Sequence, residues 1–201
     1  MIADVSLSFA AERGPETEFA GNYGFELGEI GTHFVGDGAI RPATGSLVPF
    51  EGRYYAAIST GRRILSNNVA QDDSISKLIL GPISRPFAAL SFYCNFVSAE
   101  FNEYIGRGFD DIARVTVFGP RGSLTKTITS VDLVGTSNMP FIGHPGLPDG
   151  GDSYVGYTGW RNFRIENLNV GSPAHITFVI NDVGDSRLSS ILAIDAIELE
   201  R

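Results

Sequence analysis

The sequence lacks the features that would cross-link the chain, carry it across a membrane or bring it to nucleic acid. It has one cysteine, Cys94, so no disulfide can form within the chain. Its formal net charge of −8 would repel phosphate groups and anionic membrane surfaces, so nucleic acid is not an expected partner. No apolar run reaches the length that spans a bilayer, and we expect no membrane insertion.

A signal peptide is also missing, because the first residues have neither a basic segment nor an apolar one. If the protein is secreted, its signal sequence lies outside these 201 residues or export uses another route. The single cysteine fits the cytosol and a bacterial secreted protein equally well.

Residues that favour long helices are scarce, whereas turn and strand residues are abundant. The chain has two methionines but 24 glycines, 10 prolines, 14 phenylalanines and 7 tyrosines. This composition favours many short strands joined by turns. At 201 residues the chain can bury a substantial core without disulfides, and no linker divides it. We therefore predict a single β-sandwich domain over residues 1–201.

Alternation of apolar and polar residues predicts where the strands lie. The clearest case is residues 86–97, where Leu90, Phe92, Cys94 and Phe96 share one face and place Cys94 in the core. A Gly81-Pro82 pair is expected to end the strand before it. Strands at this spacing indicate an antiparallel sandwich or barrel with few or no helices. The other strands are predicted at residues 5–9, 25–27, 33–35, 53–60, 74–80, 112–118, 123–131, 160–165, 175–180 and 191–199.

Carboxylates gather in a few loops and at one unusual strand position. In a regular strand, Asp195 would share a face with Ile191 and Ile197, and an unpaired carboxylate buried there would be costly. Asp195 must then be protonated, paired with a cation, bonded to backbone or bound to a metal. Calcium prefers such oxygen ligands, but most of these acids could equally be solvated loop residues. The acidic set is Glu100, Glu103, Asp110, Asp111, Asp182, Asp185 and Asp195.

The longest segment without periodicity, residues 135–159, leads into the only tryptophan. Loops of this length are usually functional or mobile. Sugar-binding sites stack aromatic rings on pyranose C–H groups and orient hydroxyls with acids, amides and arginines. The alternative is that Trp160 and some of the tyrosines fill the sandwich core. The candidate ligand-binding residues are Asp152, Tyr154, Tyr157, Trp160 and Arg161.

Support for a catalytic mechanism is weak. The three histidines are dispersed, and neither a zinc-ligand spacing nor a G-x-S-x-G elbow occurs. The strand pattern predicts that Cys94 is packed in the core and does not act as a nucleophile. Paired carboxylates such as Glu100 and Asp111 could serve a glycoside hydrolase, which is the least favoured hypothesis. We expect that the protein is not an enzyme.

Four stretches resemble families of bacterial surface domains. Residues 92–111 (FYCNFVSAEFNEYIGRGFDD), 181–199 and 54–61 (YYAAISTG) resemble choice-of-anchor-type domains. Residues 22–28 (NYGFELG) resemble the opening of galactose-binding-like carbohydrate modules. The resemblance implies an extracellular jelly-roll sandwich of bacterial cell-surface proteins and adhesins, in which several members carry a structural Ca²⁺. Matched position by position, it implies the metal ligands Glu100, Asp111, Asp185, Asp195 and Glu26.

Together these features predict a non-catalytic binding or adhesion module that is stabilised by calcium. We expect a secreted or cell-surface location, with a glycan or a cell-surface protein as partner. The acidic loop at residues 100–111 is expected to clasp the C-terminal strand through Asp185 and Asp195. The alternative function is a structural subunit of a surface layer or particle, which would assemble as a homo-oligomer.

Overall fold

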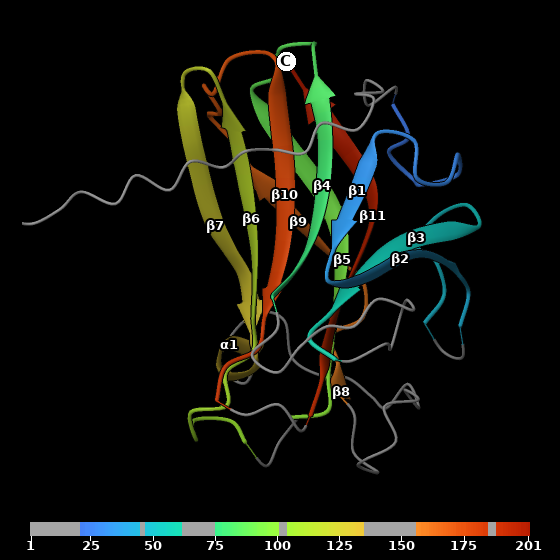
Figure 1. The fold of residues 1–201 in the computed structure, drawn as a ribbon, viewed down its shortest axis with the longest axis vertical. Coiled ribbons are helices and arrows are strands. Elements are labelled where there is room, and N and C mark those ends of the chain that lie inside the picture. The colour runs from blue at the N-terminus through green and yellow to red at the C-terminus, as the bar shows by residue number, and fades with distance from the viewer. Residues whose placement is uncertain (1–20, 45–46, 62–74, 101–103, 135–155, 185–187) are drawn as a thin grey trace, which may run out of the picture.

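The fold is known from a computed structural model, which describes residues 21–44, 47–61, 75–100, 104–134, 156–184 and 188–201. Two antiparallel sheets face each other (Figure 1). The first is a five-stranded sheet in the order β1-β4-β10-β6-β7. Its strands are β1 (Thr32–Val35), β4 (Ile75–Ile83), β10 (Ala174–Asn181), β6 (Ile112–Gly119) and β7 (Gly122–Ser130).

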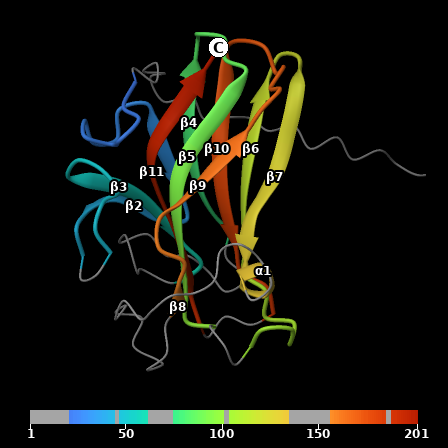
Figure 2. The same cartoon turned by 180° about the vertical axis from the view of Figure 1, so that it is seen from behind.

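The second sheet has six strands, and it lies behind the first in Figure 1 and in front of it in Figure 2. Its order is β2-β3-β11-β5-β8, and β9 also pairs with β5. The strands are β2 (Asp37–Pro42), β3 (Tyr54–Ser59), β11 (Ser190–Glu200), β5 (Ala89–Ser98), β8 (Gly156–Tyr157) and β9 (Arg161–Ile165).

This arrangement confirms the predicted antiparallel β-sandwich of jelly-roll type with few helices. In the part of the chain that the structure describes, the only helix is α1 (Val131–Val134). No helix there is long and apolar enough to cross a bilayer.

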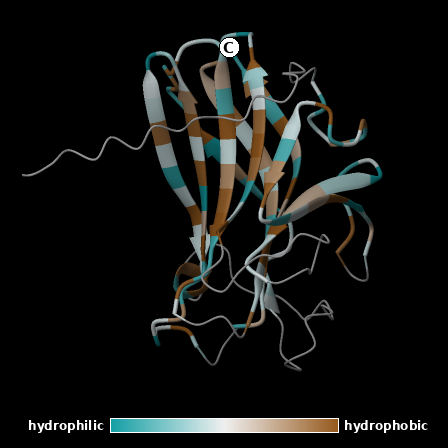
Figure 3. Ribbon diagram, in the orientation of Figure 1, coloured by the Kyte–Doolittle hydropathy of each residue, from teal (hydrophilic) through white to brown (hydrophobic). Residues whose placement is uncertain are grey.

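The main core lies between the sheets, where each strand contributes every second side chain. Phe92 and Phe96 of β5 and Phe178 of β10 are fully buried there. Buried and partly exposed residues alternate along most of β4, β6 and β10. Figure 3 shows hydrophobic residues interspersed with polar ones in this sheet. Cys94 lies in this core as predicted, and burial raises the pKa of its thiol to about 12. The thiol is therefore protonated and shielded, which makes it unsuited to nucleophilic chemistry.

A second apolar cluster lies on the opposite face of the six-stranded sheet. We call this face, which points away from the five-stranded sheet, the outer face. Four partly buried side chains pack against the cluster: Ala39, Tyr157, Trp160 and Leu188. The buried members are Leu47, Tyr55, Ala57, Val97, Ala99, Ile191 and Ala193.

Most predicted strands are present, with two errors and two omissions among the described residues. Residues 25–27 form a turn in which Phe25 has φ +60° and is buried, and the Leu27 amide donates to Asn22 Oδ1 at 2.9 Å. β4 continues through Gly81 and Pro82, because the pairing of β4 with β10 shifts at this point and requires no amide from the proline. β2 and β8 were not predicted, and the strand predicted at 5–9 lies outside the described residues.

A bulge in β11 places Asp195 and Ile197 on opposite faces of the sheet. The pairing of β11 with β5 shifts between Asp195 and Glu198, and Ala196 has φ +47°. Ile197 therefore returns to the main core, while Asp195 lies on the outer face with Ile191. The prediction that Asp195 shares a face with Ile197 is wrong, because the extra residue reverses the alternation.

Candidate functional site

Residues 47–53, which we call the strap, precede β3 and lie over the outer face of the six-stranded sheet. Asp195 holds the middle of the strap. Its Oδ2 accepts hydrogen bonds from the amides of Phe50 at 2.9 Å and Glu51 at 3.1 Å, and its Oδ1 accepts one from Ala196 at 2.8 Å. The buried Asp195 carboxylate thus caps backbone amides, which is one of the roles that the sequence left open.

Glu26 holds the end of the strap. Its Oε1 accepts hydrogen bonds from the amides of Arg53 at 2.7 Å and Tyr54 at 3.0 Å. Gly52 lies between these contacts with φ +64°, and a Cβ there would be 2.3 Å from Glu26 Oε1. The close approach of Glu26 to the strap therefore requires glycine at position 52.

Burial raises the pKa of Asp195 to about 6, and the negative charge of Glu51 adds to the increase. The three amide hydrogen bonds oppose this change because they favour the charged form. A Cβ built on Gly24 would lie 3.4 Å from Glu51 Oε1 and 3.8 Å from Asp195 Oδ1. Negative charge is therefore concentrated around Gly24, where the strap meets β11.

Four aromatic rings, which we call the ring cluster, surround the middle of the strap: Phe50, Tyr55, Tyr93 and Trp160. The Phe50 ring stacks on Tyr93 with centroids 3.5 Å apart, and Trp160 meets Phe50 edge-on at 6.3 Å and Tyr55 edge-on at 6.0 Å. Trp160 Nε1 donates to the carbonyl oxygen of Val48 at 2.8 Å, which fixes the indole against the strap. Phe50 keeps 42% of its surface exposed, so the cluster presents aromatic area to solvent.

Polar side chains lie beside the ring cluster on the outer face. Asn162 of β9 lies directly opposite Tyr93 and is exposed, and Arg164 lies opposite Ser91 two residues further on. Arg164 bonds to Glu200 Oε2 at 2.8 Å and to Glu166 Oε1 at 2.9 Å. The outer face therefore joins exposed aromatic surface to hydrogen-bonding groups on neighbouring strands.

The predicted ligand-binding residues are only partly brought together. Tyr157 and Trp160 pack against the outer cluster, so Trp160 does not fill the main core as the alternative proposed. Arg161 is held locally, with its Nε donating to the Thr158 carbonyl at 3.1 Å. Asp152 and Tyr154 lie outside the described residues. Sequence reasoning missed Phe50, although the alternation in β5 had placed Tyr93 away from the core.

Asp111 forms a buried polar junction away from the strap. Its Oδ1 accepts from the Val183 amide at 3.1 Å and its Oδ2 from the Thr60 hydroxyl at 3.2 Å. Burial raises the pKa of Asp111 to about 6, while hydrogen bonds from Ser190, Val183 and Thr60 favour the charged form. Asp111 thus links the start of β6 to the turn before β11.

The residues predicted to bind calcium fall in two places. Asp111 contacts Ser190 at the start of β11, whereas Asp195 lies five residues further along this strand, roughly 16 Å away at strand spacing. Glu26 and Asp195 meet at the strap, and Asp185 lies outside the described residues. Glu100 is buried near Ser98, whose hydroxyl accepts from its amide at 3.0 Å. The hydrogen bonds of Asp111 therefore reach Val183 and the start of β11, and they do not reach Asp195.

A calcium site needs six to eight oxygen ligands close together, more than the acidic side chains at the strap offer. Within the described residues, no group of three or more His, Cys, Asp or Glu side chains has the arrangement of a metal site. At the strap, three carboxylate oxygens are engaged by backbone amides, as described above for Asp195 and Glu26. The carboxylate of Glu51 near Gly24 and the exposed side of Glu26 are the groups there that a cation could reach.

No protein-family model matches the sequence, and no curated protein is detectably similar to it. Several solved structures are similar to it. TmCBM61, solved in complex with β-1,4-galactotriose, has 16% identity and a TM-score of 0.48, covering 92% of this chain and 98% of that one. The carbohydrate-binding module CBM28, specific for non-crystalline cellulose, has 12% identity and a TM-score of 0.46, covering 89% and 92%.

The K1 cleaved adhesin domain of Lys-gingipain from Porphyromonas gingivalis W83 is also similar in structure. It has 13% identity and a TM-score of 0.48, covering 88% of this chain and 95% of that domain. Because these identities and TM-scores are low, the function of this chain has to be argued from its own residues.

Proposed function

We propose that this chain is a non-catalytic glycan-binding module that works at the cell surface or outside the cell, with residues 1–201 as one domain. The ring cluster on the outer face carries this proposal. It places exposed aromatic surface beside Asn162 and the paired Arg164 on a sheet face that the main core does not use.

Aromatic surface with polar neighbours is the chemistry that a sugar requires. The C–H face of a pyranose packs on a ring, while its hydroxyls need donors and acceptors at the edge of that ring. The pair formed by Phe50 and Tyr93 supplies the first, and Asn162 supplies the second. The strap holds Phe50 in place before any ligand arrives, so little ordering entropy is lost on binding.

A binding role without catalysis fits the state of the reactive groups. The carboxylates of Asp111 and Asp195 are buried and accept hydrogen bonds from the protein itself. A glycosidase needs two carboxyl groups that face the scissile bond from a shared cleft. Cys94 lies in the main core with a raised pKa.

Truncating the ring cluster tests the proposal. We expect Phe50→Ala and Trp160→Ala each to weaken binding to neutral polysaccharides about tenfold or more, as loss of an aromatic anchor does in other binding sites. Affinity electrophoresis against a panel of soluble plant and microbial polysaccharides measures this effect, and a melting curve for each variant checks the fold.

Phe118→Ala is the matched control, because Phe118 is 39% exposed and stacks on His175 in the other sheet. This variant should bind as the unmodified protein does. If the two ring-cluster variants retain full binding to every ligand of the unmodified protein, the proposed surface is wrong.

The proposal includes calcium as a stabilising ion attracted by the negative charge at the strap, and not one held by a built coordination site, since the described residues form no such group of ligands. Glu26, Glu51 and Asp195 bring negative charge together around Gly24, and a divalent cation would neutralise their repulsion. Such an ion, reached by Glu51 and by the exposed side of Glu26, would tie the strap to the turn before β1.

We expect millimolar calcium to raise the melting temperature by about 5 °C or more over a sample with chelator. Glu51→Gln should reduce this shift, whereas Glu29→Gln, at an exposed neighbouring position, should not. Equal melting temperatures with calcium and with chelator would refute the calcium part and leave the glycan-binding part standing.

A further inference from the structure

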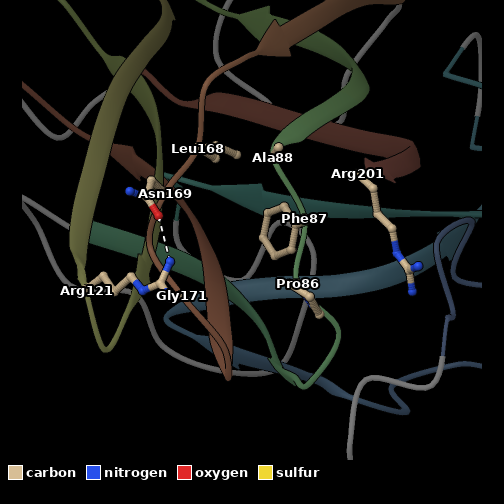
Figure 4. Close-up of a pocket in the computed structure, with 8 residues that line it drawn as sticks. All are labelled: Pro86, Phe87, Ala88, Arg121, Leu168, Asn169, Gly171 and Arg201. Carbon is tan, nitrogen blue, oxygen red and sulfur yellow. Dashed lines mark hydrogen bonds between the residues drawn. The ribbon is translucent and has the colours of Figure 1, made fainter.

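A pocket of about 340 Å³ opens at the end of the sandwich where β11 finishes (Figure 4). Its residues are different from those of the ring cluster. Pro86, Phe87 and Leu168 supply its apolar surface, and Arg121 and Arg201 supply charge. The volume is in the range of small-molecule sites. In Figure 4 the Phe87 ring lies between the two arginine side chains.

Backbone hydrogen bonds join the walls of this pocket, which come from three loops. The Ala88 amide donates to the Glu200 carbonyl at 2.7 Å, and the Leu168 amide donates to the Ala88 carbonyl at 2.8 Å. The Arg121 amide, in the turn between β6 and β7, donates to the Val170 carbonyl at 2.8 Å. The pocket is therefore part of a connected framework that needs little rearrangement to receive a ligand.

The turn between β6 and β7 packs tightly against the loop that contains Val170, so this turn cannot move freely. A Cβ built on Gly119 would lie 2.7 Å from the carbonyl oxygen of Val170. This contact fixes the position of the turn that carries Arg121. Arg121 NH1 then donates to Asn169 Oδ1 at 3.0 Å, which orients the guanidinium and uses one of its five N–H donors.

The charge of the pocket is opposite to that of the chain. The protein carries −8 in total, yet the eight described residues that line the pocket include two arginines and no acid. The acids nearest in sequence, Glu166 and Glu200, bond to Arg164 on the outer face. An anion is therefore the ligand that this charge favours, and a planar guanidinium fits a carboxylate well.

We propose that this pocket binds a uronic acid residue of an acidic glycan, with Arg121 holding the carboxylate. Arg201 adds positive charge, Asn169 offers its amide to a hydroxyl, and the Phe87 ring packs against the sugar. The sugar part of this assignment rests on the proposed glycan-binding function, whereas the charge of the ligand follows from the pocket alone.

Isothermal titration with trigalacturonate and with its methyl ester tests the assignment. The ester keeps the sugar and removes the charge, so we expect it to bind at least about tenfold more weakly. Arg121→Gln should weaken binding of trigalacturonate about tenfold, and Arg201→Gln should weaken it less. The control Arg107→Gln removes the same charge from an exposed position in another loop and should change little.

Three results would overturn the proposal: no binding of trigalacturonate at millimolar concentration, equal binding of acid and ester, or equal losses in Arg121→Gln and Arg107→Gln. Melting curves confirm that each variant is folded. The ring-cluster variant Trp160→Ala should retain full binding of trigalacturonate. This variant also separates the two proposals, because failure of the outer face would appear with neutral polysaccharides and leave binding at Arg121 intact.

Discussion

Replacing Phe92 by alanine is expected to lower the free energy of unfolding by about 3–5 kcal/mol. Phe92 is fully buried at the centre of β5. Its ring meets Phe178 of the opposite sheet edge-on at 4.8 Å and Phe163 of β9 at 5.3 Å. Alanine would leave a cavity that both sheets line, and a strand paired on both sides cannot move to fill it.

Equilibrium unfolding in urea measures this loss, with Phe118→Ala as the comparison. Phe118 is 39% exposed, so its truncation should cost less than about 1 kcal/mol. Domains of this kind are stable by about 5–15 kcal/mol, so Phe92→Ala should be close to the limit of folding at 37 °C. Similar losses in the two variants would mean that the main core is not where the structure places it.

Replacing Asp195 by alanine is expected to cost about 2 kcal/mol and to weaken glycan binding together with it. The change removes the acceptor of three amides, two of which belong to the strap at Phe50 and Glu51. Part of this loss of stability is offset, because the variant no longer buries a carboxylate whose pKa is raised by burial. Phe50 would then lose its fixed position over Tyr93, which couples stability to binding.

The only tryptophan reports on this coupling directly. Trp160 Nε1 is bonded to the strap at Val48, so release of the strap in Asp195→Ala should shift the fluorescence emission of Trp160 to longer wavelength. Glu26→Gln is the matched comparison, because it weakens two exposed bonds at the end of the strap and should have a smaller effect. Unchanged emission and unchanged polysaccharide affinity in Asp195→Ala would show that the strap does not depend on this carboxylate.

The strands of the sandwich core could be predicted because their alternation is regular. In β10 every second residue is buried, whereas nearly every residue of β5 is buried because both of its faces are covered. In both strands the alternation of apolar residues in the sequence shows which side chains face the main core. The strap could not be predicted, since Asp195 and Phe50 are 145 residues apart and the strap has no periodicity. Nor does the sequence reveal that an alanine, residue 196, takes a positive φ. That bulge turns Ile197 into the main core, while Asp195 stays on the outer face, where it holds the strap.

Residues 25–27, which lie in the turn at 22–28, are predicted to be a strand for a similar reason. Phe25 looked like the apolar residue of an extended segment, but it enters the main core from a turn that Asn22 closes. The pocket at Arg121 was also beyond sequence reasoning, because its walls come from three loops far apart in the chain. Sequence patterns report on single elements, whereas both candidate sites arise where several elements meet.

The order of strands has a consequence for how the protein is made on the ribosome. β10 lies between β4 and β6, and β11 lies between β3 and β5, so the strands that follow all others in the chain occupy interior positions of both sheets. A nascent chain without residues 174–200 therefore has two incomplete sheets whose open edges could pair with other chains. Completion of both sheets must wait until residues 174–200 have been made, and until then the strand edges that β10 and β11 later cover stay open.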